Sequence, residues 1–253
     1  MDRCHVGVNA GGGWTNESFT TSTPPTGVTG GPNTLITGPF NGSDNNGWGT
    51  SVSTSNNGGF AGGGQVGCDY QTGAFVFGGE ADIQGYTAKA NSTTSFAPLG
   101  APTIAVSNAF SSQTPWFGTV RARIGTTALN PAVLVYATGG FAYGRENITD
   151  NMTVTRGATL VEQFPFSTSS TKTGWTVGGG LEWMFAPNWS VRAEYLYVQL
   201  DANGGQVLNT AVLGPSAEAT DAMRLDSGKD KLNIVRVGLD YKFNWAGPVV
   251  AEY

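Results

Sequence analysis

The chain has 253 residues and a formal net charge of −5, and charged residues make up only 12% of it, against roughly 25% in an ordinary soluble domain. The clustered lysines and arginines of a nucleic-acid-binding protein are absent. No apolar run reaches the 18 or more residues of a membrane helix, although aromatics make up 11% of the chain. With 38 glycines as well, this composition favours an all-β protein whose exterior is not wholly aqueous.

Eight segments alternate between apolar and polar residues, which is the period-two pattern of a β-strand with two unlike faces. In chain order they cover residues 4–14, 60–70, 74–88, 114–126, 132–146, 173–185, 189–200 and 231–243. The connections alternate between long polar loops (15–59, 89–113, 147–172 and 201–230) and tight turns (71–73, 127–131 and 186–188). Because alternate connections of an up-and-down meander lie at opposite ends, all long loops should lie at one end. Bacterial outer-membrane barrels have this asymmetry.

The last segment, KLNIVRVGLDYKF (231–243), shows how the two faces are assigned. Its apolar face is expected to meet lipid, while Arg236 and Asp240 pair inside the barrel. Charged residues fall on the same inner face of the other segments, and together they are Glu80, Asp82, Arg121, Arg123, Glu182, Arg192, Glu194, Arg236, Asp240 and Lys242. Because an eight-stranded barrel has an interior just wide enough for side chains, a paired network that plugs the barrel is favoured over an ion path or gate.

Aromatic residues gather near both ends of the expected strands. Near the tight turns they include Phe75, Phe77, Trp183, Phe185 and Trp189, and near the long loops Trp14, Tyr86, Trp116, Phe141, Tyr143 and Trp175. Two such belts match the aromatic girdles of a barrel that spans a bilayer. The alternative, a soluble sandwich with aromatics in its core, predicts no such segregation.

Several segments resemble a known family. WFGTVRARIG (116–125), VLVYATGGFAYG (133–144), LEWMF (181–185), WSVRAEYLYV (189–198) and NIVRVGLDYKFNW (233–245) are similar to the small eight-stranded outer-membrane barrels of alphaproteobacteria, which are relatives of the OmpA-type transmembrane domain and porin-like surface antigens. The resemblance implies a barrel over residues 1–243 and a periplasmic tail over 244–253. It also implies a signal for the barrel-assembly machinery in the last strand, formed by Arg236, Gly238, Leu239, Tyr241 and Phe243.

The two cysteines, Cys4 and Cys68, leave two interpretations open: a pair of buried thiols or one disulfide. Both residues lie at the tight-turn end of neighbouring strands, and even numbering puts both on the outward face. Because the resemblance places this end in the oxidising periplasm, a cross-strand disulfide is favoured.

Catalysis is not expected. The single histidine, His5, lies at the tight-turn end of the first strand, away from the outer rim where barrel enzymes have their sites, and we expect a structural role. No metal cluster or cofactor motif occurs in the sequence. We therefore expect a non-enzymatic protein of the outer membrane, with a structural and surface-interaction role. A narrow porin for small solutes is the alternative, and a soluble lipocalin-like barrel is a second one.

The expected partners follow from that placement. They are outer-membrane lipid and lipopolysaccharide, the barrel-assembly machinery during biogenesis, and surface or host ligands that bind through the external loops. Nucleic acid is not expected, and an oligomer is compatible with the sequence.

Overall fold

The computed structural model describes residues 2–16, 18–22, 51–53, 57–96, 104–201, 206–209, 222–227 and 229–244. These residues are almost entirely β-structure. The strands are β1 (Asp2–Asn16), β2 (Ser18–Ser22), β3 (Ser51–Ser53), β4 (Asn57–Thr72), β5 (Phe75–Tyr86), β6 (Lys89–Phe96), β7 (Ile104–Asn130), β8 (Val133–Arg156), β9 (Thr159–Ala186), β10 (Trp189–Leu200), β11 (Gln206–Asn209), β12 (Ala222–Ser227) and β13 (Asp230–Asn244). In this described part, no helix has the length and apolarity that a membrane crossing requires.

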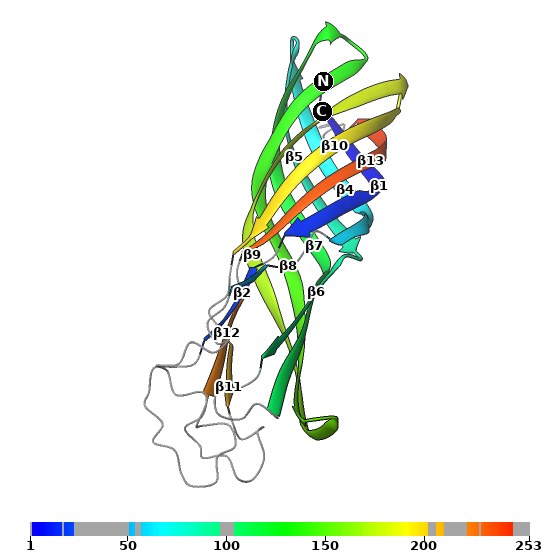
Figure 1. Cartoon of the computed structure of the whole chain (residues 1–253). Helices are drawn as coiled ribbons and strands as arrows, with labels where there is room; N and C mark the ends of the chain where they lie inside the picture. The colour runs from blue at the N-terminus through cyan, green and yellow to red at the C-terminus, as the bar shows by residue number, and fades with distance from the viewer. Residues whose placement is uncertain are drawn as a thin grey trace, which may run out of the picture.

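Eight strands form a closed antiparallel barrel, which confirms the predicted fold class. The hydrogen-bonded order is β5-β4-β1-β13-β10-β9-β8-β7, and pairing of β5 with β7 closes the ring. The first and last strands are neighbours, with Arg3 in register with Asn244. Figure 1 shows the consequence, since β1 starts and β13 ends at the same end of the barrel.

The two faces of each barrel strand differ as the alternation predicts. In β13, Arg236 and Asp240 are fully buried, whereas Val237 is 56% exposed and Leu239 is 40% exposed. The apolar face of the strand therefore points outward, where a bilayer would surround it. A soluble barrel with the same alternation would have these faces reversed.

Two-residue turns join the strands at the end of the barrel where the chain starts. They consist of Gly73–Ala74, Pro131–Ala132 and Pro187–Asn188. Each falls at a predicted tight turn, but the strands run farther than predicted, with β4 ending at Thr72 and β7 at Asn130. Gly73 has a φ of 60°, a left-handed backbone conformation that glycine adopts without the steric cost of a Cβ atom.

Two of the four predicted long loops are mostly strand. Residues 147–172 form a hairpin in which β8 and β9 continue to a two-residue turn at Gly157–Ala158, and residues 89–113 contain β6 and the first part of β7. The contrast between an apolar outer face and a polar inner face ends beyond the outer aromatic belt, but the hydrogen-bonded ladder continues, and Phe110 and Ile148 are still buried there. Figure 1 shows this extension projecting from the end of the barrel opposite the tight turns.

The other two long connections contribute short strands to a second sheet. Its order is β11-β12-β2-β3, so pieces of 15–59 and 201–230 pair beyond the barrel. The remainder of these two connections lies outside the described residues. The predicted periplasmic tail also lies outside them after Asn244, the last residue of β13.

Glycines on the inner face allow the narrow barrel to curve. A Cβ atom on Gly63 would lie 2.0 Å from the backbone oxygen of Ile83, and one on Gly140 would lie 2.1 Å from that of Val120. By contrast, a Cβ atom on the outward-facing Gly79 would meet nothing closer than 3.9 Å. Part of the high glycine content is therefore a requirement of barrel curvature.

Candidate functional site

The barrel interior holds a dense group of ion pairs, here called the charged layer. It consists of Glu80, Asp82, Arg121, Arg123, Glu182, Arg192, Glu194, Arg236 and Asp240 together with His5, Asp69 and Lys242. The ten charged residues predicted for the lumen are therefore all on the inner face and all in contact with members of this group. Each comes from a barrel strand whose other face is exposed and apolar.

Arg121 lies at the centre of the charged layer. Its Nη2 atom donates to Asp82 Oδ2 at 2.7 Å and to Glu80, and its Nη1 atom donates to Glu194 Oε1 at 2.9 Å. Strand β7 brings Arg121 opposite Glu80 of β5, and Glu194 reaches it from β10 across the lumen. One guanidinium thus joins carboxylates from two sides of the barrel.

Arg236 and Arg192 bind acids from other strands. Arg236 donates from Nε to Glu194 at 2.7 Å and from Nη2 to Asp82 at 3.0 Å. Arg192 donates from Nε and Nη2 to the two carboxylate oxygens of Asp240, at 2.6 and 2.8 Å. Arg236 and Asp240 therefore do not pair with each other as predicted, because residues four apart in a strand are separated by about 13 Å.

The part of the charged layer nearest the tight turns includes two residues, His5 and Asp69, that the sequence pattern did not assign to the network. Arg123 donates to Glu182 at 2.9 Å and to Asp69 at 2.8 Å, and Lys242 pairs with Glu182. His5 Nε2 lies 3.2 Å from Glu80 Oε2, which gives this buried histidine a structural contact. Asp69 and His5 have odd residue numbers, and the odd-numbered residues of β4 and β1 face the lumen. The alternation of the two strands could therefore have placed both side chains inside the barrel.

Neutral polar side chains complete the coordination of these acids. Gln65 Nε2 donates to Asp240 Oδ1 at 2.7 Å, and Tyr136 OH donates to Glu194 Oε1 at 3.1 Å. Buried carboxylates need such hydrogen bonds in addition to their ion pairs, because burial removes the water that would otherwise solvate them.

The outer half of the interior is apolar, which the sequence analysis did not anticipate. A buried cluster, here called the apolar layer, consists of Ala61, Tyr86, Ala88, Phe117, Ala142, Leu196, Val198, Leu200, Leu232 and Ile234. Phe117, Leu196 and Ile234 have no solvent exposure. Tyr86 packs edge-on against Phe117 with ring centroids 6.4 Å apart, so it belongs to this layer and not to the outer aromatic belt.

Beyond the apolar layer lies a second, smaller group of ion pairs, here called the rim cluster. Lys172 of β9 donates to Asp230 of β13 at 3.0 Å and pairs with Glu146 of β8 at 2.8 Å. Ser112 of β7 donates to the same Glu146 at 3.2 Å. All four side chains are buried, so the rim cluster joins four strands where the barrel passes into its outer extension.

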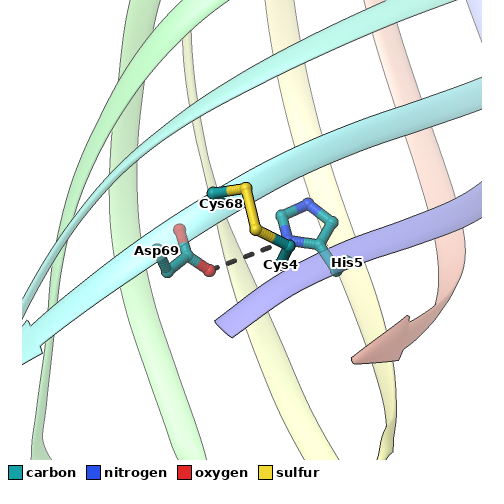
Figure 2. The surroundings of a disulfide bond; sticks show 4 residues. All are labelled: Cys4, His5, Cys68 and Asp69. Carbon is teal, nitrogen blue, oxygen red and sulfur yellow. Dashed lines mark ion pairs between the residues drawn. A yellow bond between two sulfur atoms is a disulfide. The ribbon is translucent and has the colours of Figure 1, made fainter. Parts of the chain in front are cut away.

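The two cysteines lie opposite each other on neighbouring strands. Cys4 of β1 is in register with Cys68 of β4, and their sulfur atoms are joined by a disulfide bond. Figure 2 shows the residues that follow the two cysteines in their strands, His5 in β1 and Asp69 in β4, which approach diagonally to 3.8 Å between Nδ1 and Oδ2. A covalent bond and an ionic contact on opposite faces of the strand pair thus join β1 to β4 within one residue of the same position.

Apart from Tyr86, the aromatic residues predicted for the two belts lie on the outward face. Exposed side chains at the tight-turn end are Phe75, Phe77, Trp183, Phe185 and Trp189, and at the outer end Trp14, Phe141 and Trp175. Tyr143 packs edge-on against Trp116, with ring centroids 6.1 Å apart. The two belts therefore bound a zone of outward-facing Val, Leu, Ile, Ala and Gly.

The predicted assembly-signal residues occupy the two faces of β13. Leu239 and Tyr241 are exposed to the outside, and Arg236 is in the charged layer. Gly238 faces inward, where a Cβ atom would lie 3.0 Å from Arg192 Cγ and 3.0 Å from Gln65 Nε2. The absence of a side chain at this position makes room for the Arg192 stem.

Comparison with known proteins places this architecture among bacterial outer-membrane barrels. The chain is 35% identical over 187 residues to the 31 kDa outer-membrane immunogenic protein of Brucella melitensis, covering 74% of this chain and 67% of that protein. Among solved structures, it is similar to OprG from Pseudomonas aeruginosa (TM-score 0.48, 12% identity, 95% and 96% of the two chains) and to Ail of Yersinia pestis (TM-score 0.37, 14% identity, 94% and 98%).

The family assignment covers nearly the whole chain. The profile of the outer membrane protein beta-barrel domain matches residues 5–243, the same region that the eight barrel strands occupy with their connections. The family match implies a location in the outer membrane of a Gram-negative bacterium, and the aromatic belts and the outward apolar faces agree with it. The chain belongs to the outer membrane protein beta-barrel domain family.

Proposed function

We propose that this protein is a non-conducting, non-enzymatic barrel that supports the envelope and presents its outer extension for surface interactions. The observation that carries the proposal is the filling of the interior by two unlike layers in series. Arg121, Arg192 and Arg236 in the charged layer have at most 2% exposure, and Phe117 and Leu196 in the apolar layer have none.

The charged layer opposes conduction because its charges are matched at short range. Each of the three central arginines donates to at least two carboxylates, and a passing ion would have to displace these contacts. The apolar layer opposes conduction for a different reason, since almost all of its side chains are hydrocarbon and offer an ion no ligand in place of its water shell. A small solute would need to open both layers.

The surface role rests on the outer extension. The hairpin of β8 and β9 and the strands β6 and β7 are rich in serine, threonine and asparagine beyond the membrane zone, and strand pairing holds this polar surface away from the bilayer. The name of the Brucella relative describes an immunogenic outer-membrane protein, which fits a surface of this kind. We propose surface or host ligands as partners of this extension.

Two further partners belong to the same proposal. Lipopolysaccharide would surround the outer half of the barrel, and the barrel-assembly machinery would act on β13, where Leu239 and Tyr241 are on the lipid-facing side. The non-enzymatic assignment is supported by the placement of His5, which lies in the charged layer near the tight turns and contacts Glu80 and Asp69.

Single-channel recording in planar bilayers tests the proposal against its alternative, a narrow porin. We expect the purified protein to insert without stable conductance steps. Heat-modifiable migration in SDS gels must show that the barrel in the same preparation is folded. An absence of conductance then cannot be the result of denaturation. Reproducible steps from the folded protein would overturn the proposal in favour of the porin.

A further inference from the structure

The disulfide between Cys4 and Cys68 lies on the lipid-facing side of the barrel wall. Both cysteines occupy even-numbered positions of their strands, and the even-numbered neighbours Val6 and Val66 are exposed on the outward face. The odd-numbered His5, next to Cys4, is 2% exposed and belongs to the charged layer. Figure 2 shows the disulfide and this histidine on the same stretch of the wall. The two sulfur atoms therefore face away from the lumen.

The depth of the disulfide follows from the aromatic belt near the tight turns. Tyr70 of β4 is in register with Phe77 of β5, and both side chains are exposed on the outward face. Cys68 lies one outward-facing position farther from the turn than Tyr70, and Cys4 is in register with it. Because belt aromatics mark the boundary of the hydrocarbon region, the disulfide lies just on the hydrocarbon side of that boundary.

The side chains around the disulfide are apolar. Along the two strands, its outward-facing neighbours toward the middle of the membrane are the two valines named above. Across the strands, Cys4 is in register with Phe243 of β13, and Cys68 is in register with Gly79 of β5. In the bilayer, these residues and the lipid chains exclude water and bulky reagents from the two sulfur atoms.

Formation of this bond requires a reaction that the inserted barrel disfavours. A disulfide forms when a thiolate attacks a sulfur atom of an existing disulfide. The thiolate is charged, and a charged group loses free energy of hydration where water is excluded. A protein oxidant would also have to bring its own disulfide against the wall, where aromatic side chains and lipid cover the site. Both conditions are met before insertion, when the chain is unfolded in water.

The unfolded chain can form only one intramolecular disulfide. It has two cysteines, so oxidation joins Cys4 to Cys68 without any folded structure to select the partner. Before insertion the chain is in the periplasm, which is an oxidising compartment. Early oxidation is therefore chemically available and carries no risk of a wrong pairing within the chain.

We propose that a periplasmic dithiol oxidase forms the Cys4–Cys68 disulfide on the unfolded chain, before the barrel enters the membrane. The thiolate of one cysteine attacks the disulfide of the oxidase, which gives a mixed disulfide and releases one oxidase thiolate. The thiolate of the other cysteine then attacks the sulfur of the first and releases the second oxidase thiolate. Two electrons and the two cysteine protons pass to the oxidase, which leaves as a dithiol.

Early oxidation joins β1 to β4 in the correct register before the barrel closes. The connection between them, residues 17–56, is the longest between neighbouring barrel strands, and a long connection does not fix the register as a two-residue turn does. Cys4 and Cys68 are a register pair, so their disulfide supplies the alignment. The other edge of β1 stays available for pairing with β13.

Oxidation rates before and after insertion test the proposal. Reduced protein is placed either in urea or in phosphatidylcholine vesicles, where heat-modifiable migration confirms the fold, and oxidised glutathione is added to both. We expect the inserted protein to oxidise about 100-fold more slowly than the unfolded chain, because its thiolates are disfavoured. Equal rates would overturn the proposal. Reduction of the oxidised protein by dithiothreitol should show the same protection, and this measurement does not require the reduced barrel to fold.

The variant C4S/C68S/S95C/S107C is the matched control, since it moves the cysteine pair from lipid into water on the same barrel. Ser95 of β6 and Ser107 of β7 are in register on the outer extension, and their exposed Oγ atoms are 3.0 Å apart. We expect this pair to be oxidised and reduced in the folded barrel at least as fast as in urea. Protection equal to that of the native pair would show that folding alone is responsible, and would overturn the proposal.

Cells depleted of the barrel-assembly machinery test the order of events. Free thiols of the accumulated, unassembled chain are trapped with a maleimide after acid quenching. We expect no labelling, and free thiols in this pool with a disulfide only in the assembled barrel would overturn the proposal. Removal of the periplasmic dithiol oxidase should leave both thiols free in the assembled barrel, and a disulfide formed there without the oxidase would also overturn it. None of these outcomes depends on whether the barrel conducts.

Discussion

Arg192 donates hydrogen bonds to both carboxylate oxygens of Asp240, and Gly238 leaves room for the stem of the arginine side chain. The same arginine donates from Nη1 to Glu80 on the far side of the barrel. β10, β13 and β5 are therefore joined through the lumen as well as through the wall. Three of the four predictions below address these internal contacts.

Replacing Arg192 by methionine should lower the free energy of unfolding by about 3–5 kcal/mol, because Asp240 and Glu80 would lose a buried partner. Urea unfolding in detergent micelles measures the effect. The double variant R192M/D240L should be less destabilised than R192M, since the stranded charge is then removed as well. Equal stability of R192M and wild type would show that the ion pair is dispensable.

Replacing Gly238 by alanine should destabilise the barrel by about 1–3 kcal/mol, because the new Cβ atom would crowd Arg192 and Gln65. Gly64→Ala is the matched control, since its Cβ would point outward with its nearest neighbour 3.7 Å away. Refolding both variants into detergent without assembly machinery separates the two roles of this glycine. A loss of stability there identifies a packing role, and a defect found only in cells would instead support the assembly signal.

Replacing Phe117 by alanine should cost about 3–5 kcal/mol, because this ring is the largest side chain of the apolar layer that is fully buried. We expect no conductance from this variant, because the charged layer would still close the lumen. Chemical denaturation gives the stability, and planar-bilayer recording gives the conductance. Stable steps from F117A alone would mean that the apolar layer is the sole barrier.

The Cys4–Cys68 disulfide should protect both thiols from labelling in the denatured, unreduced protein, and reduction should expose two reactive thiols. With a separation of 64 residues, the variant C4S/C68S should lose about 4 kcal/mol, since the unfolded chain is no longer constrained. Mass spectrometry after alkylation counts the thiols. Two labelled cysteines before reduction would contradict the prediction.

Much of the barrel could be predicted from the sequence because the membrane imposes a strict alternation. In β13, lipid requires apolar residues such as Val237 and Leu239 on one face, and the narrow lumen accepts Arg236 and Asp240 on the other. The strand boundaries followed from the turns, where Gly73 and the two prolines interrupt the pattern. The apolar and polar alternation ends where the bilayer ends. For this reason the sequence predicts loops for the outer parts of β7, β8 and β9, which the structure shows as strands.

The interior was less predictable, because alternation separates faces but does not specify partners. Strand parity places Arg192 inside, yet its partners Asp240 and Glu80 come from strands 48 and 112 residues away. The apolar layer was missed because β10 is apolar on both faces near Leu196 and Val198. Where both faces of a strand are apolar, the alternation cannot indicate which side chains fill the lumen.

The sequence by itself determined the strand order, the lipid-facing side and the end at which the chain starts, because each depends on local alternation and on connection length. Only the tertiary structure decided which charges meet and how the lumen is divided into charged and apolar layers. These features depend on barrel closure and on the stagger between strands, which bring distant residues to one height.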